Sequence, residues 1–360
     1  MNVSDFDYHL PPERIAQKPL AERDASQMLV LDRANGDYQD HAFRRFADLL
    51  RGDELLVFNN ARVLPARLFG RREGIHREQH GEGSTQFLSA QIEVLLVRKV
   101  GEELWECLVR PGRKVPTGER IVFGGGELEA RVEDRGNYGL RLVRFAAKGN
   151  FREVVERLGH VPLPPYIKRS DDPADRDRYQ TIYARRGSAV AAPTAGLHFT
   201  GQMLEKIRAR GSETAEITLD VGLGTFEPVR TERIEEHKIH KESYEISSGV
   251  AEAILRAKQD GRPVLAVGTT VVRALEDAAA KGAGTRNLLA PGQAEADIFL
   301  LPGSEFRVVD QLLTNFHLPQ STLLALVCAF AGRDNVLGAY RHAVESEYRF
   351  YSYGDCMLIR

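Results

Sequence analysis

The sequence is poor in the residues and patterns that mark several protein classes. It has only three cysteines, and Cys107, Cys328 and Cys356 lie too far apart for a disulfide framework or a cysteine-rich zinc site. Its longest purely apolar run is nine residues, 323–331, whereas a membrane-spanning helix needs about 20. The first residues lack a basic and then apolar signal segment, so we expect a cytoplasmic protein.

An excess of one charge is also missing. Lys and Arg total 49 against 51 Asp and Glu, and this neutral total at first argues against a nucleic-acid partner, because such proteins usually carry a basic excess. The charges are unevenly spread, however. Residues 60–77 hold five arginines against one glutamate, whereas residues 212–246 hold nine acidic side chains against four basic ones. The sequence therefore excludes a protein that binds nucleic acid through a large overall positive charge, but it is compatible with a local RNA-binding patch.

Length and patterning favour an α/β protein with an inserted domain. At roughly 150 residues per domain, 360 residues suggest two domains or one large domain with an insertion. Short β-rich runs separated by turn residues are typical of a small barrel or sandwich. Strands that alternate with helices are typical of an α/β layer. The β-rich runs are 91–98, 104–109, 120–123, 127–134 and 138–145.

Strands that alternate with helices are predicted on both sides of that β-rich block. A buried strand is predicted at 55–58, and after residue 150 the predicted strands are 188–192, 214–221, 264–267 and 297–301. The predicted helices are 201–210, 249–259, 270–281, 321–331 and 335–347. We therefore predict a mixed-sheet α/β domain formed by 1–73 and 151–360, interrupted by a small β-barrel domain at 74–150.

Four loops of unusual composition follow strands or open helices: 193–200, 222–228, 268–270 and 314–321. In open α/β sheets, ligands bind at the carboxyl ends of the strands, where helix N-termini offer free N–H groups. We expect the loops to line one polar pocket. Each also has a purely structural explanation, because the glycines suit turns, the threonines suit helix caps and His198 or His317 suits a core.

Motifs for other cofactors are weak or missing. The pair Gly222 and Gly224 has no third glycine, and Pro228 prevents the helix that a dinucleotide site requires. The phosphate-binding motif GxxxxGK[ST] does not occur in the sequence. His237, His240 and Glu242 invite a metal interpretation, but a solvated surface turn explains them as well and HExxH is absent. We expect no metal.

Residues 166–186 interleave basic side chains with Tyr166, Tyr179 and Tyr183. Basic groups can neutralise phosphates while aromatic rings stack on unpaired bases. A salt-bridged surface loop is the structural alternative.

Many long motifs, in one order along the chain, resemble those of the S-adenosylmethionine:tRNA ribosyltransferase-isomerases of queuosine biosynthesis. The resemblance covers essentially the full length. The motifs are 5–11 (DFDYHLP), 15–17 (IAQ), 59–68 (NNARVLPARL), 162–167 (PLPPYI), 177–184 (DRYQTIYA), 192–200 (APTAGLHFT), 219–226 (LDVGLGTF), 236–244 (EHxxHxExY), 268–276 (GTTVVRALE) and 315–324 (NFHLPQSTLL).

The resemblance implies a reaction and an architecture. The ribosyl part of S-adenosylmethionine would move to the aminomethyl group of a 7-deazaguanine base at the tRNA wobble position. The sugar would be rearranged to an epoxycyclopentanediol, giving epoxyqueuosine and releasing adenine and methionine. An α/β domain with an inserted β-barrel agrees with the fold predicted above.

Site residues follow from the loops and the resemblance together. The catalytic candidates are His198, Asp220, Glu227 and His317. The candidates for binding S-adenosylmethionine are Thr194, Gly222, Gly224, Thr225, Phe226, Gly268, Thr269, Thr270 and Phe316. The candidates for tRNA contacts are Arg62, Arg67, Tyr166, Lys168, Arg169, Arg178 and Tyr179.

Two other functions remain open from sequence. An S-adenosylmethionine-dependent RNA methyltransferase would yield S-adenosylhomocysteine, whereas a non-catalytic RNA-binding module would use an OB-like barrel. We expect a monomer.

Overall fold

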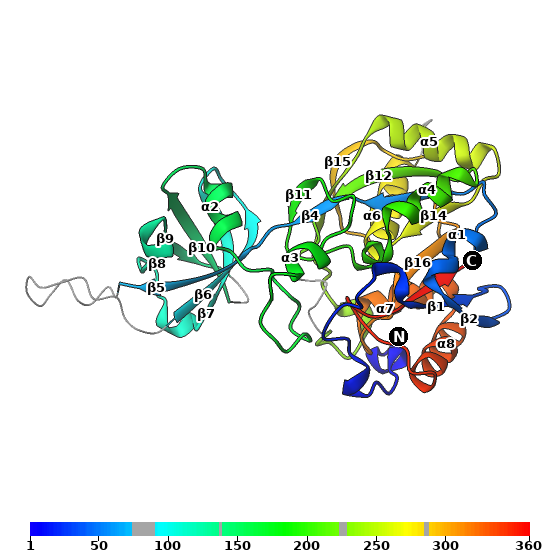
Figure 1. Ribbon diagram of the computed structural model, residues 1–360, viewed down its shortest axis with the longest axis horizontal. Helices are drawn as coiled ribbons and strands as arrows, with labels where there is room; N and C mark the ends of the chain where they lie inside the picture. Colours follow the sequence, from blue (N-terminus) through cyan, green and yellow to red (C-terminus); the bar gives the residue numbers. More distant parts are fainter. Residues whose placement is uncertain (74–90, 137–138, 223–228, 284–287) are drawn as a thin grey trace, which may run out of the picture. The chain divides into compact units, whose positions relative to one another are not determined.

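The computed structural model describes residues 1–73, 91–136, 139–222, 229–283 and 288–360, which divide into two compact units (Figure 1). Unit 1 comprises Met1–Arg62, Pro164–Ser170 and Asp177–Arg360. Unit 2 comprises Val63–Leu163 and Asp171–Arg176. The predicted domain division at residues 74 and 150 remains a prediction. Strand β5 (Arg67–Arg72) of unit 2 lies ahead of residue 74.

Unit 1 is built on a nine-stranded mixed sheet in the order β15-β13-β12-β3-β14-β16-β17-β1-β2. At its centre, β3 (Leu55–Asn59) pairs in parallel with β12 (Glu213–Leu219) and β14 (Val264–Val267), and β14 pairs in parallel with β16 (Gln311–Asn315). The carboxyl ends of these four strands therefore meet at one edge. The other strands are β1 (Gln27–Leu31), β2 (Tyr38–Ala42), β13 (Glu242–Ile246), β15 (Gly292–Ala296) and β17 (Cys356–Ile359).

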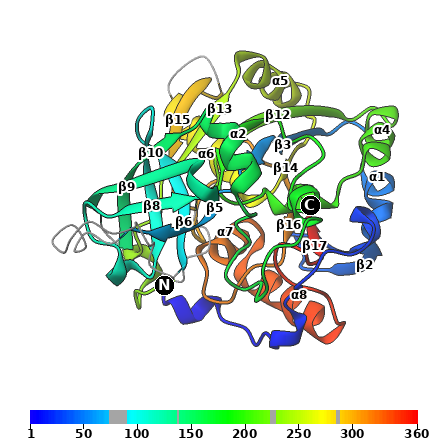
Figure 2. The same ribbon diagram turned by 60° about the vertical axis from the view of Figure 1, so that its left-hand side comes forward.

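Helices cover both faces of this sheet (Figures 1 and 2). Successive side chains of a strand point to opposite faces, so Leu55 and Val57 of β3 join one core cluster, and Leu56 and Phe58 join the other. Helices α5 (Ser248–Gln259), α6 (Thr269–Gly282), α7 (Thr322–Ala331) and α8 (Arg333–Glu345) contribute to the first cluster. Helices α1 (Phe46–Leu49) and α4 (Gly201–Ala209) contribute to the second.

Helix α4 shows how the local sequence sets the ends of a helix. Thr200 caps it, because its Oγ1 accepts a hydrogen bond of 3.1 Å from the backbone N–H of Met203. Met203, Leu204 and Ile207 form its buried stripe. Gly211 follows with a φ of 103°, a left-handed conformation that ends the helix. The helix predicted at 201–210 is confirmed.

The longest apolar run of the sequence lies in α7, most of whose side chains are buried in unit 1. Within the described parts of the chain, no one helix has the length and apolar character of a membrane span. Helices α7 and α8 meet that criterion only as a pair, and the pair is bent by 116°.

Unit 2 contains a closed antiparallel barrel in the order β10-β7-β6-β5-β8-β9. Its inward positions are apolar and alternate with outward ones, as in Leu128, Ala130 and Val132 of β9. The remaining strands are β6 (Gln91–Lys99), β7 (Leu104–Arg110), β8 (Arg120–Phe123), β9 (Leu128–Arg135) and β10 (Leu140–Ala147), with helix α2 (Phe151–Leu158) after them. Elsewhere, β4 (Ala61–Val63) pairs with β11 (Arg186–Ala189), and α3 spans Asp175–Arg178.

The predicted fold class, a mixed-sheet α/β fold with a small β-barrel, is confirmed. The strand predicted at 297–301 is wrong, because β15 ends at Ala296 and the following apolar side chains pack against the core from a loop. The sequence also missed eight strands: β1, β2, β4, β5, β13, β15, β16 and β17. Of these, β2 and β15 have mostly exposed side chains that lack apolar alternation.

Replacing Phe58 by Ala should destabilise unit 1 strongly. Phe58 is 1% exposed and packs edge-on against Tyr183 and Phe199, at ring-centroid distances of 4.9 and 5.1 Å. Removing a buried Phe ring costs about 3–5 kcal/mol of the free energy of unfolding, which denaturant unfolding would measure. The control Glu205→Ala, at an exposed position of α4, should change it by less than about 0.5 kcal/mol. Equal effects of the two substitutions would contradict this packing.

Candidate functional site

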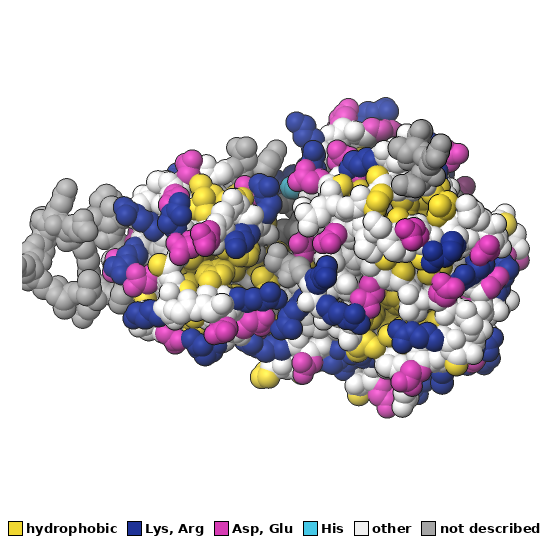
Figure 3. All heavy atoms as spheres, turned by 90° about the horizontal axis from the view of Figure 1, so that it is seen from above, with side chains coloured by type: hydrophobic (Ala, Val, Ile, Leu, Met, Phe, Trp, Pro, Cys, Tyr) yellow, Lys and Arg dark blue, Asp and Glu magenta, His cyan; other side chains and the backbone are white. Residues whose placement is uncertain are grey.

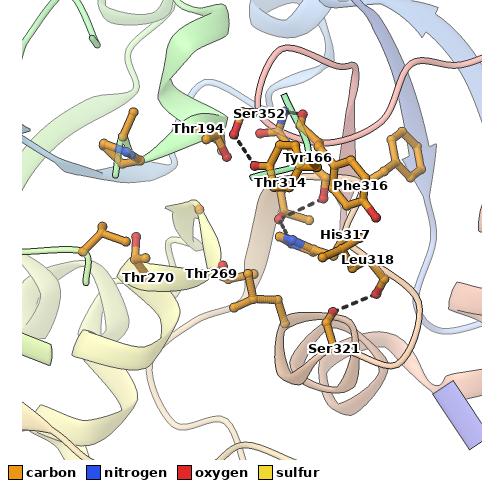
Figure 4. Close-up of a pocket in the computed structure, with 18 residues that line it drawn as sticks. Tyr166, Thr194, Thr269, Thr270, Thr314, Phe316, His317, Leu318, Ser321 and Ser352 are labelled. Atoms are coloured by element: carbon orange, nitrogen blue, oxygen red, sulfur yellow. Dashed lines mark hydrogen bonds between the residues drawn. The ribbon is translucent and has the colours of Figure 1, made fainter. Parts of the chain in front are cut away.

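A cavity opens at the carboxyl edge of the parallel strands of unit 1 (Figure 4). Its volume is about 650 Å³ including the part open to solvent. We call it the main cavity. Its wall is formed by Tyr166, residues 192–195, Val221, residues 268–270, residues 314–318, Ser321, Leu323, Tyr351 and Ser352.

Helix α6 starts at this wall. Its N-cap residue Gly268 has φ 101° and ψ 148°, a conformation that is essentially restricted to glycine. Thr269 and Thr270 form the first turn, and no side chain caps the helix. The helix dipole places partial positive charge at this end. The threonines are therefore not cap residues, and this end of α6 is suited to an anionic group.

His317 follows β16 and lies at the cavity wall beside Thr314 (Figure 4). Its Nε2 is 2.8 Å from Thr314 Oγ1. The backbone is held on both sides, because its N–H donates to Tyr340 Oη at 3.1 Å and its carbonyl accepts from Tyr8 Oη at 2.5 Å. Burial lowers the pKa of His317 to about 3, so the ring is uncharged at neutral pH.

Three buried polar atoms in this wall have no hydrogen-bond partner within the part of the chain that the structure describes. They are Thr270 Oγ1, Asn315 Oδ1 and Tyr351 Oη. Leaving a buried polar group unpaired costs about 1–3 kcal/mol. The backbone of Tyr351 is also strained, because its φ is 71°. Unpaired atoms and strain at one cavity are features of ligand sites.

The contacts of the Asn315 amide orient it. Its Nδ2 lies 3.0 Å from the carbonyl oxygen of Tyr351 and 3.4 Å from that of Asp355, so it is the donor there. It also lies 3.3 Å from His198 Nε2, which then acts as acceptor. The His198 hydrogen is left on Nδ1, 2.8 Å from Ser26 Oγ. Oδ1 of Asn315 is thereby left as an unpaired acceptor.

Two tyrosines give the main cavity an aromatic side. The rings of Tyr166 and Tyr351 stack with centroids 4.5 Å apart and an interplanar angle of 23°. Tyr166 Oη lies 2.5 Å from Ser352 Oγ, a contact drawn in Figure 4. Aromatic faces attract cations and stack on flat ligands.

The predicted catalytic residues are only partly brought together. His317 lies at the main cavity. His198 is 4% exposed and lies behind Asn315, in the wall of a separate cavity with Arg23. Asp220 follows β12 and is half-buried, next to the lining residue Val221. Glu227 lies outside the described residues.

The predicted S-adenosylmethionine contacts divide in the same way. The main cavity is lined by Thr194, Gly268, Thr269, Thr270 and Phe316. The ring of Phe316 is fully buried in a cluster with Tyr340 and Phe350. Gly222 follows the lining residue Val221 but does not itself line the cavity, and its N–H donates to Glu242 Oε1 at 3.2 Å. Gly224, Thr225 and Phe226 lie outside the described residues.

The two predicted RNA-stacking tyrosines differ. Tyr166 lies at the main cavity. Tyr179 is completely buried, edge-on to Tyr353 at 5.8 Å, and burial raises its pKa. Stacking of Tyr179 on a base would require this packing to open.

The predicted basic contacts also occupy different environments. Lys168 and Arg62 are exposed. Arg169 donates to the Gln17 carbonyl at 2.9 Å, and Arg178 donates to that of Ala21 at 2.9 Å. In unit 2, Arg67 pairs with Glu93 at 3.1 Å. On the face of unit 1 that Figure 3 shows, basic and acidic side chains are interspersed.

Residues absent from the predicted site also line the main cavity, notably Thr314, Asn315, Tyr351 and Ser352. Thr314 and Asn315 stood in a loop singled out by composition. Tyr351 and Ser352 carried no such signal, since they reach the cavity only because β17 pairs antiparallel with β16. That pairing brings the segment before β17 to the carboxyl edge of the parallel strands.

The described residues contain no cluster of three or more His, Cys, Asp or Glu side chains arranged to hold a metal. His237, His240 and Glu242 line a further cavity with Arg273. Glu242 Oε2 accepts a hydrogen bond of 2.5 Å from Arg273 Nη1, and both side chains are buried.

His198 should make the stability of unit 1 depend on pH. Burial, followed by the positive charges of Arg349 and Arg23, lowers its pKa to about 4. Below its ordinary pKa of about 6.5, the unfolded chain binds a proton that the folded chain does not. His198 therefore does not lower the free energy of unfolding above pH 6.5. As the pH falls from 6.5 toward 4, the free energy of unfolding decreases by about 1.4 kcal/mol per pH unit.

Unfolding measured between pH 6.5 and 5 should show a shallower pH dependence for His198→Gln than for the wild type. The matched control is His9→Gln, at an exposed position, and it should keep the wild-type slope. Identical slopes for all three proteins would contradict the neutral buried His198.

Comparisons with known proteins agree with the resemblance found in the sequence. Residues 3–359 match the family described as queuosine biosynthesis protein. The S-adenosylmethionine:tRNA ribosyltransferase-isomerases of Solibacter usitatus and Halothermothrix orenii are 53% and 49% identical, over 100% of each chain. The crystal structure of S-adenosylmethionine tRNA ribosyltransferase from Thermotoga maritima is 35% identical, with a TM-score of 0.54, covering 99% of this chain and 100% of that one. The chain therefore belongs to the queuosine biosynthesis protein family, the family of the S-adenosylmethionine:tRNA ribosyltransferase-isomerases.

Proposed function

We propose that this enzyme transfers the ribosyl moiety of S-adenosylmethionine to the aminomethyl group of 7-aminomethyl-7-deazaguanine at the tRNA wobble position. The transferred sugar is isomerised to an epoxycyclopentanediol, giving epoxyqueuosine, while adenine and methionine leave. We further propose that it acts as a cytoplasmic monomer. Membership of the family over the whole chain supports the reaction.

The observation that carries the assignment of the site is the main cavity with its unpaired polar atoms. Thr270 Oγ1, Asn315 Oδ1 and Tyr351 Oη come from three different segments and are all buried without protein partners among the described residues. A ligand rich in hydroxyl, amine and carboxylate groups would satisfy them. S-adenosylmethionine has all three kinds of group.

The surroundings suggest how the co-substrate is oriented. The start of α6, with Thr269 and Thr270, suits the methionine carboxylate, because a helix N-terminus stabilises negative charge. The stacked Tyr166 and Tyr351 suit the sulfonium, by cation–π attraction. Asn315 Oδ1 accepts a hydrogen bond from a hydroxyl or amine of the ligand.

Proton transfer needs a base close to the 5′ carbon, which the neighbouring sulfonium acidifies. The low pKa of His317 leaves its ring neutral, so we assign it to hydrogen bonding and orientation rather than to proton donation. Asp220 and Glu227 remain our candidates for the base, because a carboxylate carries the negative charge suited to this task. His198 touches Asn315, and we propose that it positions that amide.

Phosphates of the anticodon arm would be neutralised by the basic candidates Arg62, Arg67, Lys168, Arg169 and Arg178. Its bases would stack on Tyr166 and Tyr179. Anticodon loops are single-stranded, so a base can enter a pocket without a duplex being opened. A modest basic surface suits an enzyme that must release its RNA after each turnover.

The reaction is tested by incubating the protein with S-adenosylmethionine and tRNA that carries the deazaguanine precursor, followed by mass analysis of nucleosides and small products. We expect epoxyqueuosine, adenine and methionine. S-adenosylhomocysteine with a methylated nucleoside would instead identify a methyltransferase. Binding of the tRNA without any product would favour a non-catalytic module.

Thr270→Val tests the cavity itself. The substitution keeps the shape of the side chain and removes the unpaired hydroxyl. If this hydroxyl binds the co-substrate, the KM for S-adenosylmethionine should rise roughly tenfold, equivalent to about 1.4 kcal/mol. The control Thr214→Val changes the same residue type near the amino end of β12, at the opposite edge of the sheet. An unchanged KM in Thr270→Val would remove this hydroxyl from the site.

A further inference from the structure

Another cavity of unit 1, different from those lined by His317 and by Arg273, has two arginines in its wall. It has a volume of about 300 Å³ including the part open to solvent. Arg23 and Arg178 line it, together with Leu197, His198, Ser352 and Tyr353. We call it the arginine cavity.

The protein holds both guanidinium groups in place without neutralising them. Arg23 donates to the carbonyl oxygens of Leu197 at 3.3 Å and Asp177 at 2.5 Å. Arg178 donates from Nη1 to the carbonyl oxygen of Ala21 at 2.9 Å. Carbonyl oxygens carry no net charge, so these contacts fix the geometry and leave the positive charges available.

No carboxylate forms an ion pair with Arg23 or Arg178 in the described ranges. Glu22 also lines the cavity, but its carboxylate pairs with Arg44. In addition, Arg178 Nε is buried and has no hydrogen-bond partner among the residues that the structure describes. One N–H of this guanidinium is therefore unused.

The two positive charges also affect each other. Burial, and then the charge of Arg178, lowers the pKa of Arg23, and the nearby Asp177 carboxylate offsets only part of this. Two like charges held together without an ion-pair partner are destabilising unless an anion joins them. A phosphate suits such a pair, because planar guanidinium groups donate parallel hydrogen bonds to its oxygens.

The arginine cavity adjoins the main cavity. Ser352 lines both. His198, in the wall of the arginine cavity, lies 3.3 Å from Asn315 Nδ2 of the main cavity. A phosphate in one cavity and a reacting base in the other would thus be separated by a single layer of side chains. Within one nucleotide, the base and the backbone phosphate likewise lie close together, joined by the sugar.

We propose that the arginine cavity binds a backbone phosphate of the RNA substrate beside the nucleotide that enters the main cavity. This inference rests on the proposed function, which supplies the RNA. Arg23 and Arg178 bind the phosphate and thereby position the adjoining nucleotide at the main cavity, which also holds the co-substrate.

The test uses the full chain and a synthetic anticodon stem–loop RNA, whose affinity is measured over a series of salt concentrations. Arg23→Gln and Arg178→Gln should each weaken binding several-fold and lower the salt slope by about 0.7–0.9. Arg23→Lys and Arg178→Lys, which keep the charge, should retain most of the slope while losing affinity. The control Arg256→Gln, at an exposed position of α5, should leave both quantities unchanged.

Unchanged RNA affinity and salt slope in both glutamine variants would overturn the proposal. A parallel titration uses inorganic phosphate. Loss of phosphate binding in these variants with normal RNA binding would also overturn it, because the site would then serve the free anion. The RNA measurement needs no turnover, so a protein that forms no product but shows the expected slopes would refute the proposed reaction and leave the phosphate site standing.

Discussion

The parallel hydrogen-bonded register of β12, β3, β14 and β16 is the constraint on which the rest of unit 1 depends. Parallel strands end at the same edge, so the segments that follow them are brought together however far apart they lie in the chain. Residues near 221, 268 and 317 share one cavity for this reason. The apolar side chains on the two faces of the strands hold the edge in place by packing against helices on both sides.

A second constraint is that buried polar groups at that edge need hydrogen-bond partners. The amide nitrogen of Asn315 contacts two backbone carbonyl oxygens and His198 as a hydrogen-bond donor. Its oxygen, like the hydroxyls of Thr270 and Tyr351, is left unpaired in the cavity wall. Most buried polar groups in proteins are paired. Several exceptions in one wall therefore support the proposal that this cavity binds a ligand.

The same reasoning separates the two histidines that the sequence treated alike. His317 lies in the cavity wall, whereas His198 is enclosed between Ser26 and Asn315. Burial lowers the pKa of both, so neither ring carries a positive charge at neutral pH. The proposed binding of the cationic sulfonium in the main cavity would therefore meet no electrostatic repulsion from these rings.

The sequence by itself determined the family, the mixed α/β class with a barrel, and the loops at 193, 268 and 314, because long motifs and apolar periodicity are local properties of the chain. It missed Tyr351 and Ser352, since they reach the cavity only through the antiparallel pairing of β17 with β16. It named His198 as a catalytic candidate without showing that this side chain is buried against Asn315, and it did not single out Arg23. Only the tertiary structure decided these points, because whether a polar atom is paired or an arginine is neutralised depends on neighbours that are distant in the sequence.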